Sequence, residues 1–193
     1  MKKTIWCFLM PVLIMILGAC GSKSHEDSTD MAEDQNEEKF QGDAEDDADF
    51  AVEAANGGMM EVQLGTLALT KASNAQVKQF AQMMVDDHTK ANNELKALAQ
   101  QKNISLPTTL DNEHQRKYDK LNEKSGEDFD KDYIDLMVSD HKEDVKKFED
   151  EGEDGKDAEL KSWSAAKVPT LRHHLDEAQR IQDALKNNDS ARK

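Results

Sequence analysis

Apolar residues recur every three or four positions over four long stretches of the sequence, and this spacing constrains the fold most strongly. Because an α-helix has 3.6 residues per turn, side chains at this spacing lie on one helix face. No stretch shows the alternating pattern of a half-buried strand. The pattern therefore predicts an all-α fold with long helices over residues 47–70, 73–102, 125–148 and 157–187.

Short polar segments separate these stretches and predict where each helix starts or stops. Ser73 with Gln76 forms a capping box, and Pro107 prevents the second helix from continuing. Residues 110–123 predict a short, polar connector helix, and residues 149–157 an acidic turn. Pro169 predicts a kink in the last helix. At 1.5 Å per residue the four helices would each be roughly 36–46 Å long, which is enough to bury a four-helix-bundle core.

The N-terminus has the order of features found in exported proteins. Lys2 and Lys3 precede an apolar run over residues 5–17, which is too short to span a membrane. The sequence Leu17-Gly18-Ala19-Cys20 that closes it resembles a bacterial lipobox. We predict a lipoprotein signal peptide at 1–19 and lipidation of Cys20, the alternative being an ordinary signal peptide or an uncleaved anchor. Cys7 would leave with the signal, so the mature chain would offer no disulfide, zinc–thiolate site or cysteine nucleophile.

The segment that follows is strongly acidic. Residues 20–49 contain twelve Asp or Glu but only Lys23 and Lys39, with few apolar residues, which predicts a disordered acidic tether over 20–46. The bundle would then cover 47–187, and 188–193 would fray. The formal net charge of the whole chain is -15, which argues against a nucleic-acid partner because phosphate neutralisation needs Lys and Arg.

Four ionisable residues fall where the helical pattern expects apolar ones. The sequence Met-Val-x-Asp-His occurs twice, ending at His88 and His141, and Glu61 and His174 hold comparable positions on the other two long helices. All four lie near the middle of their helices, so their side chains should converge at one level of the bundle.

This convergence allows two interpretations. One carboxylate and three neutral imidazoles could bind one transition-metal ion such as zinc, iron or copper. Asp87, Asp140 and His173 are candidates to support the ligands from outside. The alternative is a structural polar layer in which Glu61 bonds to the histidines and fixes helix register without metal. Met84 and Met137, one turn before two of the histidines, suit either copper(I) or a simple core role.

These motifs resemble one known family, the bacterial domain of unknown function 4142 family, over about residues 47–187. The resemblance is carried by Phe50, Gly57-Gly58, Glu61-Val62-x-Leu64-Gly65, Val77-x-x-Phe80-Ala81, Met84-Val85-x-Asp87-His88, Phe129-Asp130-x-x-Tyr133, Met137, His141, Phe148-Glu149 and Pro169-x-Leu171-x-x-His174-Leu175. It implies a ferritin-like, exported helical bundle that is often a lipoprotein. The Glu-x-x-His pairs of di-iron bundles are absent, because Val85, Val138 and Leu171 stand three residues before the histidines.

The sequence thus predicts a non-catalytic, lipid-anchored protein of the cell envelope, with the outer membrane favoured. Its partners would be the membrane, through the lipid, and an unidentified protein in partner binding or stress tolerance. The alternative function is a transition-metal-binding bundle that uses Glu61, His88, His141 and His174 for sequestration or a redox step.

Overall fold

The computed structural model describes residues 27–191, and this part of the chain is all-helical without strands. Its six helices are α1 (Ser28–Glu37), α2 (Asp43–Lys71), α3 (Ala75–Lys102), α4 (Asn112–Asn122), α5 (Gly126–Asp154) and α6 (Ala158–Ala191). The predicted signal peptide and Cys20 lie outside the described residues. None of the described helices is long and apolar enough to cross a membrane.

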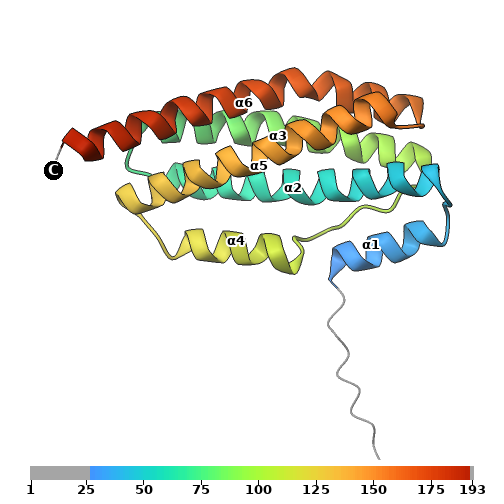
Figure 1. Cartoon of the computed structure of the whole chain (residues 1–193). Coiled ribbons are helices and arrows are strands. Elements are labelled where there is room, and N and C mark those ends of the chain that lie inside the picture. Colours follow the sequence, from blue (N-terminus) through green and yellow to red (C-terminus); the bar gives the residue numbers. More distant parts are fainter. Residues whose placement is uncertain (1–26, 192–193) are drawn as a thin grey trace, which may run out of the picture.

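The four long helices run side by side, and each contacts two of the others (Figure 1). α2 packs against α3 and α5, while α6 packs against the same two helices from the other side. Short turns join α2 to α3 and α5 to α6, so these two pairs are antiparallel hairpins. α4 lies against α2 and α5 as part of the long α3–α5 connection, and α1 lies against α2.

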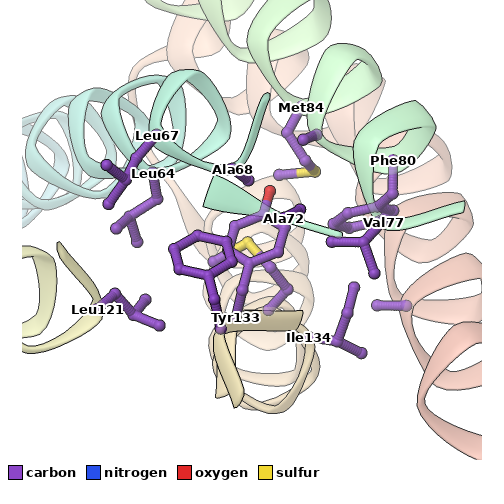
Figure 2. Close-up of a cluster of buried hydrophobic side chains, with 14 of the residues drawn as sticks. Leu64, Leu67, Ala68, Ala72, Val77, Phe80, Met84, Leu121, Tyr133 and Ile134 are labelled. Carbon is purple, nitrogen blue, oxygen red and sulfur yellow. The ribbon is translucent and has the colours of Figure 1, made fainter. Parts of the chain in front are cut away.

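The main apolar core lies between α2, α3 and α5, with contributions from α4 and α6. Figure 2 shows Leu64 and Leu67 of α2 and Phe80 of α3 turned toward Tyr133 and Ile134 of α5. The ring centroids of Phe80 and Tyr133 are 6.1 Å apart in an edge-to-face contact, which is a favoured aromatic geometry. The predicted apolar face of α3 is confirmed at Phe80, which is buried. The two methionines of the repeated motif, Met84 and Met137, are fully buried in the same core.

The predicted disorder of residues 20–46 is wrong for its described part, because residues 28–37 form α1 and α2 already begins at Asp43. The side chain of Asp27 caps α1 by accepting hydrogen bonds from the backbone of Thr29 and Asp30. Asn36 is fully buried and exchanges two hydrogen bonds with the backbone of Ser105, at 2.8 and 2.9 Å. Polar contacts therefore hold α1 in place. Such contacts leave no periodic apolar pattern in the sequence, so the helix was not predicted.

Two helix ends also differ from the sequence prediction. α5 continues through the acidic run predicted as a turn and ends at Asp154, because Gly152 acts as a contact point instead of a break. A Cβ atom at Gly152 would lie 3.1 Å from the Cβ of Ala165, so glycine allows α5 and α6 to approach closely. α6 continues through Pro169 as one helix and extends to Ala191, past the predicted end at residue 187.

The start of α3 is built differently from the predicted Ser73 capping box. Asn74 is the N-cap, and its side chain accepts hydrogen bonds from the backbone of Gln76 and Val77. The Ser73 hydroxyl instead donates to the carboxylate of Asp130 at 2.5 Å, and the backbone amides of Ser73 and Asn74 donate to the same group. Asp130 is 1% exposed, so a buried carboxylate of α5 fixes the α2–α3 turn.

Replacing Asp130 with Ala should lower the free energy of unfolding by about 2 kcal/mol, because hydrogen bonds to a buried charged group are lost and their donors stay behind. Urea denaturation monitored by circular dichroism measures this change. Asp128→Ala is the matched control, since Asp128 is an exposed carboxylate in the same turn of α5. Equal losses in the two variants would contradict a specific role for Asp130.

Candidate functional site

The four ionisable residues singled out in the sequence meet in the interior. Glu61 lies on α2, His88 on α3, His141 on α5 and His174 on α6, so each of the four long helices contributes one. Their side chains are almost completely buried, with exposed fractions of 2%, 6%, 0% and 1% in that order. The predicted convergence of these residues is therefore found in the structure.

Glu61 connects two of the imidazoles. Its Oε2 lies 2.6 Å from Nδ1 of His88, and its Oε1 lies 3.5 Å from Nε2 of His141. Among the described residues, Oε1 of Glu61 and Nε2 of His88 have no hydrogen-bond partner although both atoms are buried. Because buried polar atoms are normally paired, the site is incomplete as a purely hydrogen-bonded layer.

The partners of His141 and His174 indicate where each ring carries its proton. Nδ1 of His141 lies 3.0 Å from the carbonyl oxygen of Met137, and Nε2 of His174 lies 2.9 Å from a carboxylate oxygen of Asp87. Both partners accept hydrogen bonds, so each ring donates at that nitrogen and keeps a lone pair on the other one. Those other nitrogens, Nε2 of His141 and Nδ1 of His174, are only 3.3 Å apart. Two lone pairs therefore point into one small space.

Burial sets the protonation of the site. It lowers the pKa of His88 to about 4 and that of His174 to about 4. Burial and the neighbouring imidazoles lower the pKa of His141 well below its usual value. All three rings are consequently neutral near pH 7, which is the form that binds metal ions. Burial, together with the charge of Asp140, raises the pKa of Glu61 well above its usual value.

Of the three residues predicted to support the ligands, only one contacts a ligand in the structure. Asp87 does so, through its contact with the His174 ring on another helix. Asp140 does not, because its carboxylate forms an ion pair with Lys117 of α4, with Nζ 3.8 Å from Oδ1. His173 is exposed on α6, with its ring centroid 6.4 Å from that of His174. His114 of α4 is half-buried, and its Nδ1 lies 2.8 Å from a carboxylate oxygen of Asp111.

Sequence reasoning missed Asp144. Side-chain atoms of Glu61, His141 and Asp144 form a group within 4.8 Å of one another that could hold a metal ion, as do those of His88, His141 and His174. Burial, reinforced by Glu61, raises the pKa of Asp144 well above its usual value. The available signal was its spacing, since a residue three positions after His141 lies on the same helix face.

A cavity of about 110 Å³ adjoins the cluster. Glu61, His88 and His174 form part of its wall, and exposed Lys90 and Thr170 of α3 and α6 also line it. Trp163 lies on the wall as well, and its indole N–H donates to Glu94 at 3.2 Å. The buried histidines are thus reached from a space that extends to the surface between α3 and α6.

The fold and the site define an all-helical protein with a buried cluster of histidines and carboxylates between its long helices. The family described as Domain of unknown function (DUF4142) matches residues 31–181, and the chain belongs to this family, as its motifs predict. The matched region begins inside α1, which was predicted as part of the tether. No curated protein and no solved structure matches the chain.

Proposed function

We propose that this protein binds one divalent transition-metal ion between its four long helices, through Nε2 of His141, Nδ1 of His174 and Oε1 of Glu61. The observation that carries the proposal is the 3.3 Å contact between the two ring nitrogens whose protons are used elsewhere. Two lone pairs at that distance repel unless a cation lies between them. A metal ion there would also give the unpartnered Oε1 of Glu61 a partner.

Two of the separations between these donor atoms suit a tetrahedral ion. Metal–ligand bonds of about 2.0–2.2 Å place neighbouring ligand atoms roughly 3.3–3.6 Å apart in that geometry. The distances from Nε2 of His141 are 3.3 Å to Nδ1 of His174 and 3.5 Å to Oε1 of Glu61. These two pairs could share an ion after small shifts, whereas Nδ1 of His174 and Oε1 of Glu61 would have to move closer together, because the three residues are not one of the sets in the described chain whose ligand atoms all lie within 4.8 Å of one another.

Groups around the three ligands support the same role. The carbonyl of Met137 orients His141, the carboxylate of Asp87 orients His174, and Nδ1 of His88 orients Glu61. Such outer partners fix the ring tautomer and raise the basicity of the ligand. Two imidazoles and a carboxylate, with no thiolate, favour zinc or iron(II) over copper(I).

We further infer the setting in which the site works. The ring of packing contacts among the four long helices supports a ferritin-like four-helix bundle with α4 as connector. The lipobox-like sequence ending at Cys20 supports a lipid anchor in the cell envelope, with the outer membrane favoured. The acidic chain has no feature that suits nucleic acid. Metal binding for sequestration, without a catalytic step of the protein's own, is the function that these features favour.

The competing function is that of a non-catalytic envelope protein whose cluster only fixes the helix register. One observation favours it, namely that each imidazole already has one acceptor or acid as a partner. This function does not explain why Nε2 of His141 and Nδ1 of His174, which both carry lone pairs, lie so close together. The metal content of the purified protein distinguishes the two functions.

Elemental analysis of the full-length protein, purified without chelator or metal-affinity tag, should find about one equivalent of a transition metal per chain. His174→Ala should lose this metal, because one of the three ligands is removed. His173→Ala should keep it, since the neighbouring histidine is exposed and lies outside the cluster. A metal-free wild type that also fails to take up added zinc or iron(II) would refute the proposal.

A further inference from the structure

Gly57 is placed where neither backbone conformation nor packing calls for glycine. It lies inside α2, one turn before Glu61, and its φ angle is not in the left-handed region. A Cβ atom built there would meet no neighbouring segment of the described chain within 4 Å. Glycine inside a helix costs about 1 kcal/mol relative to alanine. The sequence therefore keeps a destabilising residue that no contact requires.

The other two glycines of α2 are required by packing, because a larger residue at either position would clash with α3. At Gly58 a Cβ atom would lie 2.1 Å from the side-chain oxygen of Asn92, and at Gly65 it would lie 2.9 Å from a methyl group of Val85. Both glycines let α3 come close to α2. Gly57 differs from them, because a Cβ atom there would have open space around it, and Gly57 lines the cavity beside the metal-binding cluster as well as a second cavity bounded by α1, α4 and α5.

The cavity beside the metal-binding cluster adjoins two residues that hold polar atoms without a partner. Glu61 and His88, which are 98% and 94% buried, each have one side-chain atom without a hydrogen-bond partner among the described residues, and both line the cavity. Side chains on a helix lean toward its N-terminus, so the side chain of Glu61 leans toward position 57, and a side chain at that position would lie beside it. The missing side chain therefore leaves the approach to Glu61 open.

We propose that Gly57 keeps this cavity open so that a small inorganic anion enters between α3 and α6 and coordinates the metal ion at a fourth position. This inference rests on the proposed metal site. It makes the ion accessible to an outside ligand, as in zinc sites with three protein ligands, instead of sealed as in structural sites.

Size and charge select the ligand class. A cavity of about 110 Å³ is well below the roughly 300 Å³ of the smallest drug-sized pockets, so only a ligand of a few atoms fits. Lys90 and Lys167 line the cavity, and although Lys167 forms an ion pair with Glu94, the open position of a divalent ion accepts an electron-pair donor and repels a cation. An anion is therefore favoured over a cation.

Azide binding to the cobalt(II)-loaded protein tests the proposal. The full-length protein in mild detergent, loaded with one equivalent of cobalt(II), is titrated with azide and followed by visible absorption, which responds to the coordination of cobalt. We expect saturable azide binding in the wild type and in Gly57→Ala. Gly57→Leu should retain cobalt but bind azide at least about tenfold more weakly, because its side chain fills the cavity.

Four results would overturn the inference. Cobalt binding without any response to azide would mean that the ion is sealed, while the metal site itself would stand. Equal azide affinities in Gly57→Leu and the wild type would exclude position 57 as the approach. A lower melting temperature of Gly57→Ala would show that this glycine is needed for packing, since open space predicts a more stable helix. Failure of the wild type to bind cobalt would remove the proposed function as well.

Discussion

Removing bound metal should lower the melting temperature of the full-length protein by about 5–15 °C. A ligand present at about 100–1,000 times its dissociation constant stabilises the folded state by about 2.7–4.1 kcal/mol. In a chain of about 150–250 residues each kcal/mol shifts the melting temperature by roughly 2–4 °C. Thermal unfolding followed by circular dichroism, with zinc in excess or with a chelator, measures the difference.

The physical reason lies in the arrangement of the donor atoms. Without a cation, the lone pairs of His141 and His174 face each other at 3.3 Å and Oε1 of Glu61 stays unpaired in the interior. Repulsion between these atoms lowers the stability of the folded chain. The metal ion binds only the folded chain, so its binding restores that stability.

A matched pair of variants keeps this result interpretable. His174→Ala should melt at the same temperature with zinc or with chelator, whereas His173→Ala should respond like the wild type. Asp87→Asn should still respond but need about 10–100 times more zinc, because it weakens only the group that orients His174. A wild-type melting temperature that is independent of zinc would speak for a structural polar layer.

The helices were predictable from the sequence because apolar burial repeats with the helical period. Val77, Phe80 and Met84 lie on the predicted face, and all three are buried. α1 was not predictable in this way, since its position depends on Asn36, whose hydrogen bonds reach Ser105 far along the chain. The start of α3 was misplaced for a similar reason, because Ser73 bonds to Asp130 of another helix.

The candidate site was predictable in its members and not in its geometry. A buried polar residue on an apolar stripe is visible in a sequence, and this rule located Glu61, His88, His141 and His174. The direction of each ring nitrogen depends on contacts across helices, such as that between Asp87 and His174. Asp144 was missed because it also fits the polar edge of α5, and only packing shows that it lies beside Glu61.

Glu151→Gln should stabilise the protein by about 2–3 kcal/mol at pH 8 and hardly at all at pH 4. Glu151 lies near the end of α5, is 8% exposed, and its Oε1 has no hydrogen-bond partner among the described residues. Burial, with the negative charges of Asp47 and Asp157, raises the pKa of Glu151 to about 7. Each unit of difference between folded and unfolded pKa corresponds to about 1.4 kcal/mol, and partial hydration of the carboxyl lowers the total to about 2–3 kcal/mol.

The direction of the pH dependence follows from proton linkage. Below pH 4.5, the usual pKa of Glu, the side chain is protonated in both folded and unfolded chains, so the wild type carries no penalty. Between this value and about pH 7 the folded chain retains a proton that the unfolded chain releases, and stability falls as the pH rises. Above about pH 7 the wild type holds a buried, ionised carboxylate, which the neutral amide of the variant avoids.

Urea denaturation of the wild type and Glu151→Gln at several pH values between 4 and 8 measures the difference directly. Other titrating groups, including the buried histidines, affect both proteins alike and cancel in the comparison. Glu153→Gln serves as the control, because this exposed neighbour should give a small difference that does not vary with pH. If the curves for Glu151→Gln and the wild type run parallel across this range, Glu151 ionises in the folded protein as it does in the unfolded chain, and its carboxyl must be solvated.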